Sequence, residues 1–282
     1  MEYVDLSSTH QRWTLRGPDA ERYLNGQVSN DVRQCRDSTG IAACVCNAKG
    51  KLEGIINIAA IEGGYLIDFP TTLEESLPLR LERYLIADDA EWNEASEEWA
   101  HWHVLGVSPD ELREMIGEND GLMRSQHRFG RLGTDLLAPF AHRDTIQAKM
   151  ERSSIKQLDS TTLNDRRIEH LSPAWDAELT PDTLPQEAGL EDTHVSFSKG
   201  CYIGQETISR IKSVGRVNRQ IVALISDNAN APLTLGAHIH LDGTTEGKPL
   251  GTITSLSSDA GTGLAILHRR AFDDQQPLAA IT

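Results

Sequence analysis

The sequence is short of basic residues. Lys and Arg together number 27 against 42 Asp and Glu, so the formal net charge at pH 7 is −15. Proteins that bind nucleic acid without a specific target need clustered cations to meet the phosphates. The composition therefore excludes general nucleic-acid binding.

Long apolar runs are absent as well. Hydrophobic residues make up 39% of the chain, and no run reaches the roughly 18 residues that a membrane-spanning helix needs. Residues 1–5 have neither the basic nor the apolar region of a secretory signal. We therefore expect a cytoplasmic protein with no membrane partner.

Cysteine is scarce, with four residues in 282 and no CxxC pair. This excludes a disulfide framework and the usual zinc spacing. Cys44 and Cys46 lie in an apolar run, where we expect inert buried thiols, with a metal pair as the alternative.

Several signatures of other chemistries are missing. There is no GxSxG elbow, GxGxxG loop or P-loop sequence, which argues against a serine hydrolase and against nucleotide binding by these routes. The HxH pairs at 101–103 and 238–240 have no third ligand at a recognisable spacing, so the sequence predicts no metal site.

The length of 282 residues suggests about two domains. Up to about residue 217, strand-like segments such as 41–46 and 52–61 mix with helix-like ones such as 18–25 and 160–169. The later apolar segments are short and separated by turn residues, which is typical of a small antiparallel barrel. We expect one domain over 1–217 and a second over 218–282.

The segment 184–216 carries the densest set of chemically useful residues, LPQEAGLEDTHVSFSKGCYIGQETISRIKSVGR. Residues 199–219 hold five Lys and Arg against one acid, Glu206, in a protein that is otherwise acidic. This local charge attracts an anionic ligand. It is too small to reverse the conclusion on nucleic acid.

Cys201 lies at the centre of this segment. The cation of Lys199 lowers the pKa of a neighbouring thiol, and Gly200 and Gly204 permit a tight loop that displays Cys201 and Tyr202. Gln205 would orient that loop. The alternative is a small buried Cys201 at the start of a strand over 207–211.

The motif SFSKGCYIGQE resembles the KGCYxGQE signature of the YgfZ family, and the match is complete over its eight positions. Further similarity covers about 1–270: LRGPDAERYLNGQVSNDV, CNAKGKLEGI, RRIEHLSP, LPQEAGL, GTITSLSS and GTGLAIL. The YgfZ family comprises tetrahydrofolate-binding proteins of iron–sulfur cluster assembly or repair, related to the glycine-cleavage aminomethyltransferase.

The resemblance implies an α+β fold in which two mixed α/β modules form a ring around a central folate channel, with a C-terminal antiparallel β-barrel. It places Glu187, in PQEAGL, where the transferases hold the pterin, and a carboxylate accepts two parallel N–H groups well. Cys201 and Lys199 are then the functional pair. Further candidate folate contacts are Tyr202, Gln205, Arg210 and Arg216.

The segment CNAKGKLEGI resembles a hairpin of the transferases, which carry paired aspartates just after its turn. Alignment on Asn47 and Gly50 places Gly54 and Ile55 at the positions of those aspartates. Neither residue transfers a proton, a kind of help typically worth about 10²–10⁴ in rate. The resemblance thus implies a non-enzymatic, tetrahydrofolate-binding accessory protein whose partners are the iron–sulfur machinery or its clients. The alternatives are a folate-dependent aminomethyltransferase and an interaction module with a vestigial pocket.

Overall fold

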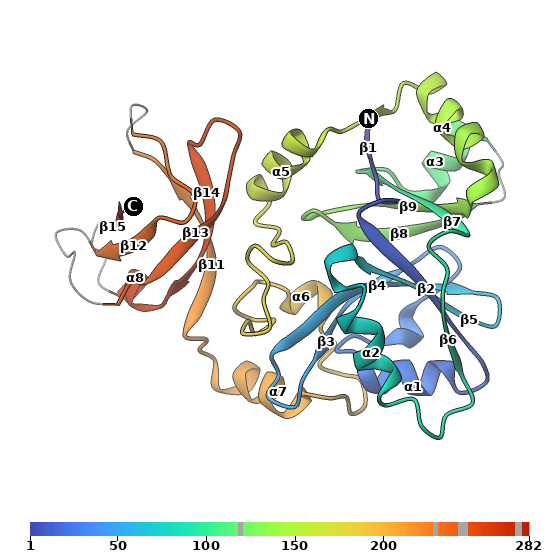
Figure 1. Ribbon diagram of the computed structural model, residues 1–282, viewed down its shortest axis with the longest axis horizontal. Helices are drawn as coiled ribbons and strands as arrows, with labels where there is room; N and C mark the ends of the chain where they lie inside the picture. Colours follow the sequence, from blue (N-terminus) through green and yellow to red (C-terminus); the bar gives the residue numbers. More distant parts are fainter. Residues whose placement is uncertain (118–120, 228–230, 242–247, 274–277, 282) are drawn as a thin grey trace.

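The computed structural model describes residues 1–117, 121–227, 231–241, 248–273 and 278–281. Its strands form three five-stranded sheets (Figure 1). Two sheets belong to the N-terminal part of the chain, and the third is built from its C-terminal part.

The first sheet has the strand order β3-β4-β5-β2-β6, and every neighbouring pair is antiparallel. Its strands are β2 (His10–Arg16), β3 (Ile41–Cys46), β4 (Leu52–Ile61), β5 (Gly64–Pro70) and β6 (Glu91–Glu94). Helices α1 (Ala20–Gln27) and α2 (Ser76–Glu82) contribute Leu24, Leu77 and Leu81 to the apolar core of this sheet. The burial of this apolar surface is what stabilises the module.

The second sheet has the order β10-β1-β7-β9-β8. Its strands are β1 (Glu2–Asp5), β7 (Trp99–Leu105), β8 (Leu122–Arg128), β9 (Arg131–Pro139) and β10 (Lys156–Gln157), with β1 and β10 the parallel pair. Helices α3 (Pro109–Ile116) and α4 (Arg143–Arg152) pack on its core around Trp102. Ser108 begins α3 with a capping box, and Pro109 occupies the first turn, where its missing N–H costs nothing.

The third sheet is antiparallel throughout, with the order β11-β14-β13-β12-β15. Its elements are β11 (Arg219–Ile225), β12 (His238–Leu241), β13 (Gly251–Leu256), β14 (Thr262–His268), α8 (Arg270–Asp273) and β15 (Leu278–Ile281). The strands curl around a separate apolar core that includes Ile253 and Leu267.

The connecting segment lies between the third sheet and the other two (Figure 1). It contains α5 (Ser160–Glu169), α6 (Glu191–His194) and α7 (Gln205–Val214). Buried Glu178 ties it to the third sheet, because its carboxylate accepts from Arg167, Thr254 and Ser255. Hydrogen bonds to a buried charge are among the stronger contacts in a protein.

The expected α+β architecture is confirmed, with a curled antiparallel sheet at the C-terminal end. The strands expected at 41–46 and 52–61 are present as β3 and β4. The helix expected over 18–25 continues through Gly26 and ends at Gln27, so its predicted end was wrong. The division at 217 stays a prediction. No helix in the described part of the chain has the length and apolar character needed to span a membrane.

Candidate functional site

Cys201 is the exposed thiol of this protein, whereas Cys35, Cys44 and Cys46 are buried. Burial raises the pKa of Cys44 to about 12 and that of Cys46 well above its ordinary value. Thiols in that state are poor nucleophiles and poor ligands, because the thiolate is the reactive form. Any thiol chemistry at the surface therefore belongs to Cys201.

The alternative placement of Cys201, buried at the start of a strand, is wrong. Residues 205–214 form the helix α7, and Cys201 precedes it on an exposed loop. Thr207, Ile208 and Ile211 are β-branched, which explains why a strand was a reasonable alternative. Ile208 packs fully buried against the first module, and this tertiary contact favours the helix.

Lys199 is buried, with 6% of its surface exposed. Its Nζ donates to the backbone carbonyls of Asn25, Val28 and Asn30 at 2.6, 2.7 and 2.8 Å. These three contacts use all three N–H groups of an ammonium. Burial lowers the pKa of Lys199 to about 8. The ammonium holds the end of α1 and the following loop, so none of its N–H groups is left to act on the thiol of Cys201.

The Cys201 loop is shaped by close backbone packing. Gly204 has φ +89°, and a Cβ there would lie 2.6 Å from the carbonyl oxygen of Asn47. The start of α7 thus rests directly on the β3–β4 hairpin, and Ile203 N donates to the carbonyl of Gly26 at 3.3 Å. Only glycine combines this left-handed conformation with so close an approach.

Tyr202 and Gln205, both predicted folate contacts, serve the loop itself in this structure. Tyr202 is buried in an apolar cluster with Cys44, Cys46 and Ile208, and its hydroxyl has no hydrogen-bond partner among the described residues. Gln205 Nε2 donates to the carbonyl of Gly200 at 3.4 Å. Their role toward folate stays a prediction.

Glu187 is buried and paired within the chain. Arg219 donates from Nε to Oε1 at 3.0 Å and from Nη2 to Oε2 at 2.8 Å, and the backbone N–H of Leu184 donates to Oε2 at 3.1 Å. Such a fork-to-fork contact is the strong form of an ion pair. The predicted pterin carboxylate therefore joins its own loop to β11, and binding a pterin there would require this pair to open.

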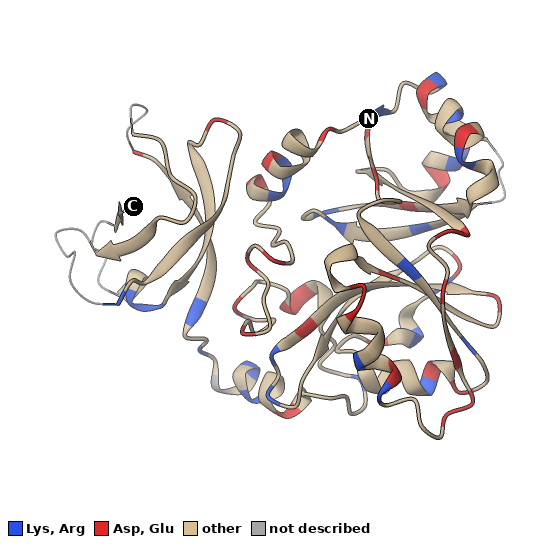
Figure 2. Ribbon diagram, in the orientation of Figure 1, with Lys and Arg blue, Asp and Glu red and all other residues tan. Residues whose placement is uncertain are grey.

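The cations of α7 and of the residues just after it lie on the surface. Arg210 and Arg216 are exposed, and Lys212 forms an ion pair with Glu191. Figure 2 shows these basic residues along α7 and the chain leading into β11. None of these three residues lines the cavities described below. Their contact with a folate tail stays a prediction.

A cavity of about 200 Å³ lies where both N-terminal sheets meet the connecting segment. The first sheet contributes His10, Ile55 and Asn57, and the second contributes His127 and Arg128. The remaining wall comes from the β8–β9 turn and the connecting segment: Phe129, Gly130, His170, Leu171, Ser172, Pro173, Gly189, Leu190, Thr193 and His194. Enclosed spaces lined by apolar groups and a few fixed polar groups are the usual form of small-molecule sites.

A second hollow of about 480 Å³ adjoins this cavity, because His127 and Thr193 line both. It is lined by residues of β3, β8 and the segment 192–198, and its wall includes the exposed side chains of Leu132 and Phe197. Ser198, three residues before Cys201, belongs to its wall. The two hollows thus adjoin each other beside β8 and the connecting segment, and the folate channel that the resemblance implies stays a prediction.

The imidazoles of His10, His127 and His194 in the cavity wall are neutral at physiological pH. Burial lowers the pKa of His10 and of His194 to about 3, and it also lowers the pKa of His127. Of the described residues that line the cavity, none is Asp or Glu. The wall therefore offers hydrogen-bond donors and neutral rings.

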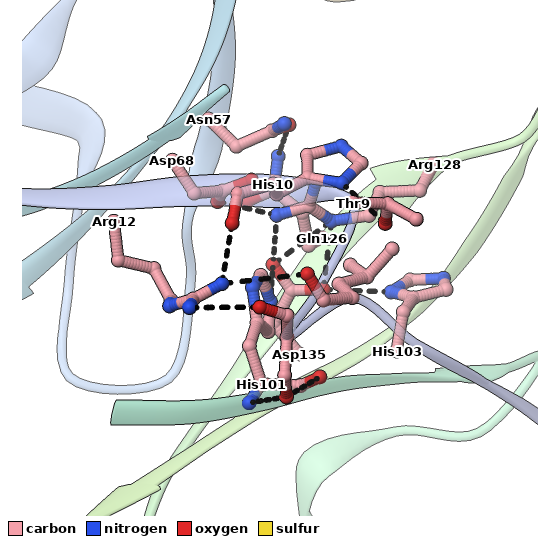
Figure 3. A network of polar contacts seen from close by, with 12 residues as sticks. Thr9, His10, Arg12, Asn57, Asp68, His101, His103, Gln126, Arg128 and Asp135 are labelled. Atoms are coloured by element: carbon pink, nitrogen blue, oxygen red, sulfur yellow. Dashed lines mark hydrogen bonds and ion pairs between the residues drawn. The ribbon is translucent and has the colours of Figure 1, made fainter. Parts of the chain in front are cut away.

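Behind the cavity wall, a buried charge network joins the two sheets (Figure 3). Arg128 on β8 donates from Nη2 to Asp68 on β5 and to Asp135 on β9, both at 2.6 Å. His103 Nδ1 lies 2.7 Å from Asp135 Oδ1. Burial alone would raise the pKa of Asp135, but the guanidinium of Arg128 reverses this and holds it well below the ordinary value.

Three members of this network, Asp68, His101 and Asp135, have ligand atoms within 4.8 Å of one another. Arg128 already lies between the two carboxylates and supplies the positive charge that a metal ion would bring. A divalent ion beside a buried guanidinium is electrostatically disfavoured. We therefore assign the group as an ion-paired junction between the sheets.

No protein-family model matches the chain. The "tRNA-modifying protein YgfZ" of Vibrio atlanticus is 25% identical over 284 residues, covering 96% of this chain and 87% of the relative. The protein of the same name from Aliivibrio fischeri is 28% identical over 279 residues, covering 93% and 84%. The YgfZ proteins are homologues of this chain.

A solved structure agrees in fold with this relationship. The glycine cleavage system aminomethyltransferase T from Bartonella henselae superimposes with a TM-score of 0.81 at 14% identity, covering 99% of this chain and 81% of that protein. The YgfZ-like chain and this transferase therefore share an architecture. Identity at this level establishes the fold and nothing of the chemistry.

Sequence reasoning missed Arg128 and Asn57 as cavity residues. They lie on β8 and β4, far from the signature motif, and neither belongs to a recognisable spacing. The one available signal was weak: alternation along β4 and β8 indicates which side chains share a face of their strand. It does not indicate which strands face each other across the modules.

Proposed function

We propose that this protein binds tetrahydrofolate in the central cavity and serves as an accessory protein of iron–sulfur cluster assembly or repair. The observation that carries the proposal is the cavity itself, which lies between the modules of a transferase-like fold in a homologue of the YgfZ proteins. Its mixed apolar and donor-rich wall suits a flat heterocycle.

Cys201 is the functional centre in this proposal. Support comes from its exposure, which the other three thiols lack, and from the fixed backbone that carries it. The segment that lines the second hollow leads directly into its loop. An exposed thiol at a folate-binding protein's surface is suited to contact a cluster or a client protein. Lys199 supports this role by positioning the loop.

The names of the relatives favour a second, compatible function in tRNA modification. The net charge of −15 argues against direct binding of RNA by this protein. We propose that any part in tRNA modification is indirect, through an enzyme whose cofactor this protein maintains.

An aminomethyl transfer reaction is disfavoured by the residues at the expected acid positions. Gly54 is packed so closely that a Cβ would lie 2.9 Å from Leu77 Cδ1, and Ile55 lines the cavity with an apolar side chain. Neither residue transfers a proton to or from a ligand. We therefore propose binding without transferase activity.

An anaerobic calorimetric titration with tetrahydrofolate tests the binding proposal. We expect micromolar binding by the wild type and, if Glu187 exchanges Arg219 for the pterin, at least tenfold weaker binding by Glu187→Ala. Glu206→Ala is the matched control, because Glu206 is an exposed acid of the same segment. No detectable heat with the wild type would overturn folate binding.

A further inference from the structure

The wall of the central cavity contains a guanidinium that is fixed on two of its three nitrogens. Arg128 Nε donates to Asp135 Oδ1 at 2.9 Å, and Nη2 donates to Asp68 and Asp135 (Figure 3). Contacts from two different sheets hold the side chain, so its orientation is fixed before any ligand arrives. Such preorganisation lowers the entropic cost of binding.

The third nitrogen is open. Among the described residues, Arg128 Nη1 has no hydrogen-bond partner. Unlike the fully buried polar atoms without a partner, such as Asp68 Oδ1, this nitrogen keeps some accessible surface. Because Arg128 lines the cavity and is only 6% exposed, that surface faces the cavity. Two N–H groups of a fixed cation thus point at the ligand space.

Asn57 adds a second donor to the same wall. Its Oδ1 accepts from Gln126 Nε2 at 2.8 Å, which assigns the amide orientation and leaves Nδ2 without a partner among the described residues. Asn57 comes from β4 and Arg128 from β8, so the two donors approach from different modules. A ligand that satisfies both must present an acceptor between them.

The charges decide what kind of acceptor fits. Asp68 and Asp135 already pair with the single charge of Arg128, and burial lowers the pKa of the neighbouring His10 and His103. A carboxylate or phosphate would bring a third negative charge to this low-dielectric site, which is costly. A neutral carbonyl oxygen accepts from both donors without that cost.

We propose that Arg128 and Asn57 are specificity-determining residues that recognise the carbonyl oxygen of a flat, neutral heterocycle. Resting on the proposed function, that oxygen is the ring carbonyl of the pterin. The apolar side chains of Ile55 and Leu190 line the same cavity and cover the faces of the ring. This recognition is separate from the one expected of Glu187, which is paired with Arg219 outside the cavity wall.

The decisive experiment compares two ligands that differ at this carbonyl oxygen and in the hydrogen on the adjacent ring nitrogen. Anaerobic calorimetry measures tetrahydrofolate and its 4-amino analogue, in which an amino group replaces the ring carbonyl. The amino group of the analogue is a donor and cannot accept a hydrogen bond from Arg128 or Asn57. We therefore expect the analogue to bind wild type at least tenfold more weakly. Equal or tighter binding of the analogue overturns the inference while leaving folate binding intact.

Protein variants locate the preference. Arg128→Lys keeps a cation between the two carboxylates but loses the Nη1 edge, and Asn57→Ala removes the second donor. We expect each to reduce the ratio of the two affinities at least threefold, whereas Arg143→Lys, a matched change at an arginine paired with Asp5, retains it. Circular dichroism and thermal unfolding verify that each variant is folded.

The variants also separate the two claims. An unchanged ratio in folded Arg128→Lys and Asn57→Ala overturns the assignment of these residues. Failure of tetrahydrofolate to bind wild type overturns the proposed folate function, and the inference falls with it. A ratio that falls in both variants, with the wild-type preference for the carbonyl, supports the recognition described.

Discussion

At the scale of single residues, the structure separates two roles that adjoin each other in the signature motif. Cys201 is exposed and accessible to a partner, whereas Lys199 is buried and donates its three N–H groups to backbone carbonyls. The lysine therefore acts on where the thiol lies. Its positive charge is stabilised by the carbonyl dipoles at the C-terminal end of α1, where a cation is favoured.

Cys201→Ser is expected to abolish cellular function while leaving the fold intact. An exposed side chain contributes little to stability, so the free energy of unfolding should change by less than about 0.5 kcal/mol. The measurement is the activity of cluster-dependent enzymes in a deletion strain that carries the variant, alongside urea unfolding of the purified protein. Full enzyme activity with the serine variant would show that the thiol is dispensable.

At the scale of elements, the short segment between residues 200 and 205 shows which part of a motif is structural. Gly204 has φ +89° and lies against the hairpin backbone, whereas a Cβ at Gly200 would have nothing within 4 Å. The two glycines of the motif thus have different reasons to be glycine. Their spacing in the sequence does not distinguish them.

Gly204→Ala is expected to destabilise the protein by about 2–4 kcal/mol, through left-handed strain and a clash with the carbonyl of Asn47. Gly200→Ala is the matched control and should change the free energy of unfolding by less than about 1 kcal/mol. Urea unfolding of both variants measures the difference. Comparable losses in the two would mean that the close packing of α7 on the hairpin is not what stabilises this loop.

Local patterns predicted most elements, because β3 and β4 are apolar runs bounded by turn residues. They failed where packing decides: the β-branched residues of α7 permitted a strand, and burial of Ile208 favours the helix. The site shows the same limit. Cys201 could be singled out from its neighbours, whereas the contacts of Glu187 with Arg219 and of Arg128 with Asp68 join distant strands.

At the scale of the whole molecule, the two N-terminal sheets meet through the buried network of Arg128, Asp68 and Asp135. The pKa of each aspartate is lowered: burial would raise it, but the charge of Arg128, together with contacts from His101, outweighs that effect. A buried ion pair of this kind is weak support for stability as such, but removing one partner is costly. The junction also fixes the cavity wall.

The network gives the stability of the molecule an acid dependence with a definite sign. A carboxyl whose pKa is lower folded than unfolded stabilises the protein above its ordinary pKa of 3.8, and this stabilisation is lost as the pH falls through the folded value. We expect the urea midpoint to fall already below about pH 6.5, because the buried, neutral His10 and His194 take up a proton only in the unfolded chain, and to fall further below about pH 4, where the two aspartates are protonated. Asp68→Asn should cost about 3 kcal/mol at pH 7 and make the acid-induced fall shallower, because one titrating group is removed from the junction. Glu206→Ala, at an exposed acid outside the network, should leave both midpoint and slope unchanged. If Asp68→Asn keeps the full acid dependence of the wild type, the sheets are held together by their apolar contacts and the network serves the cavity alone.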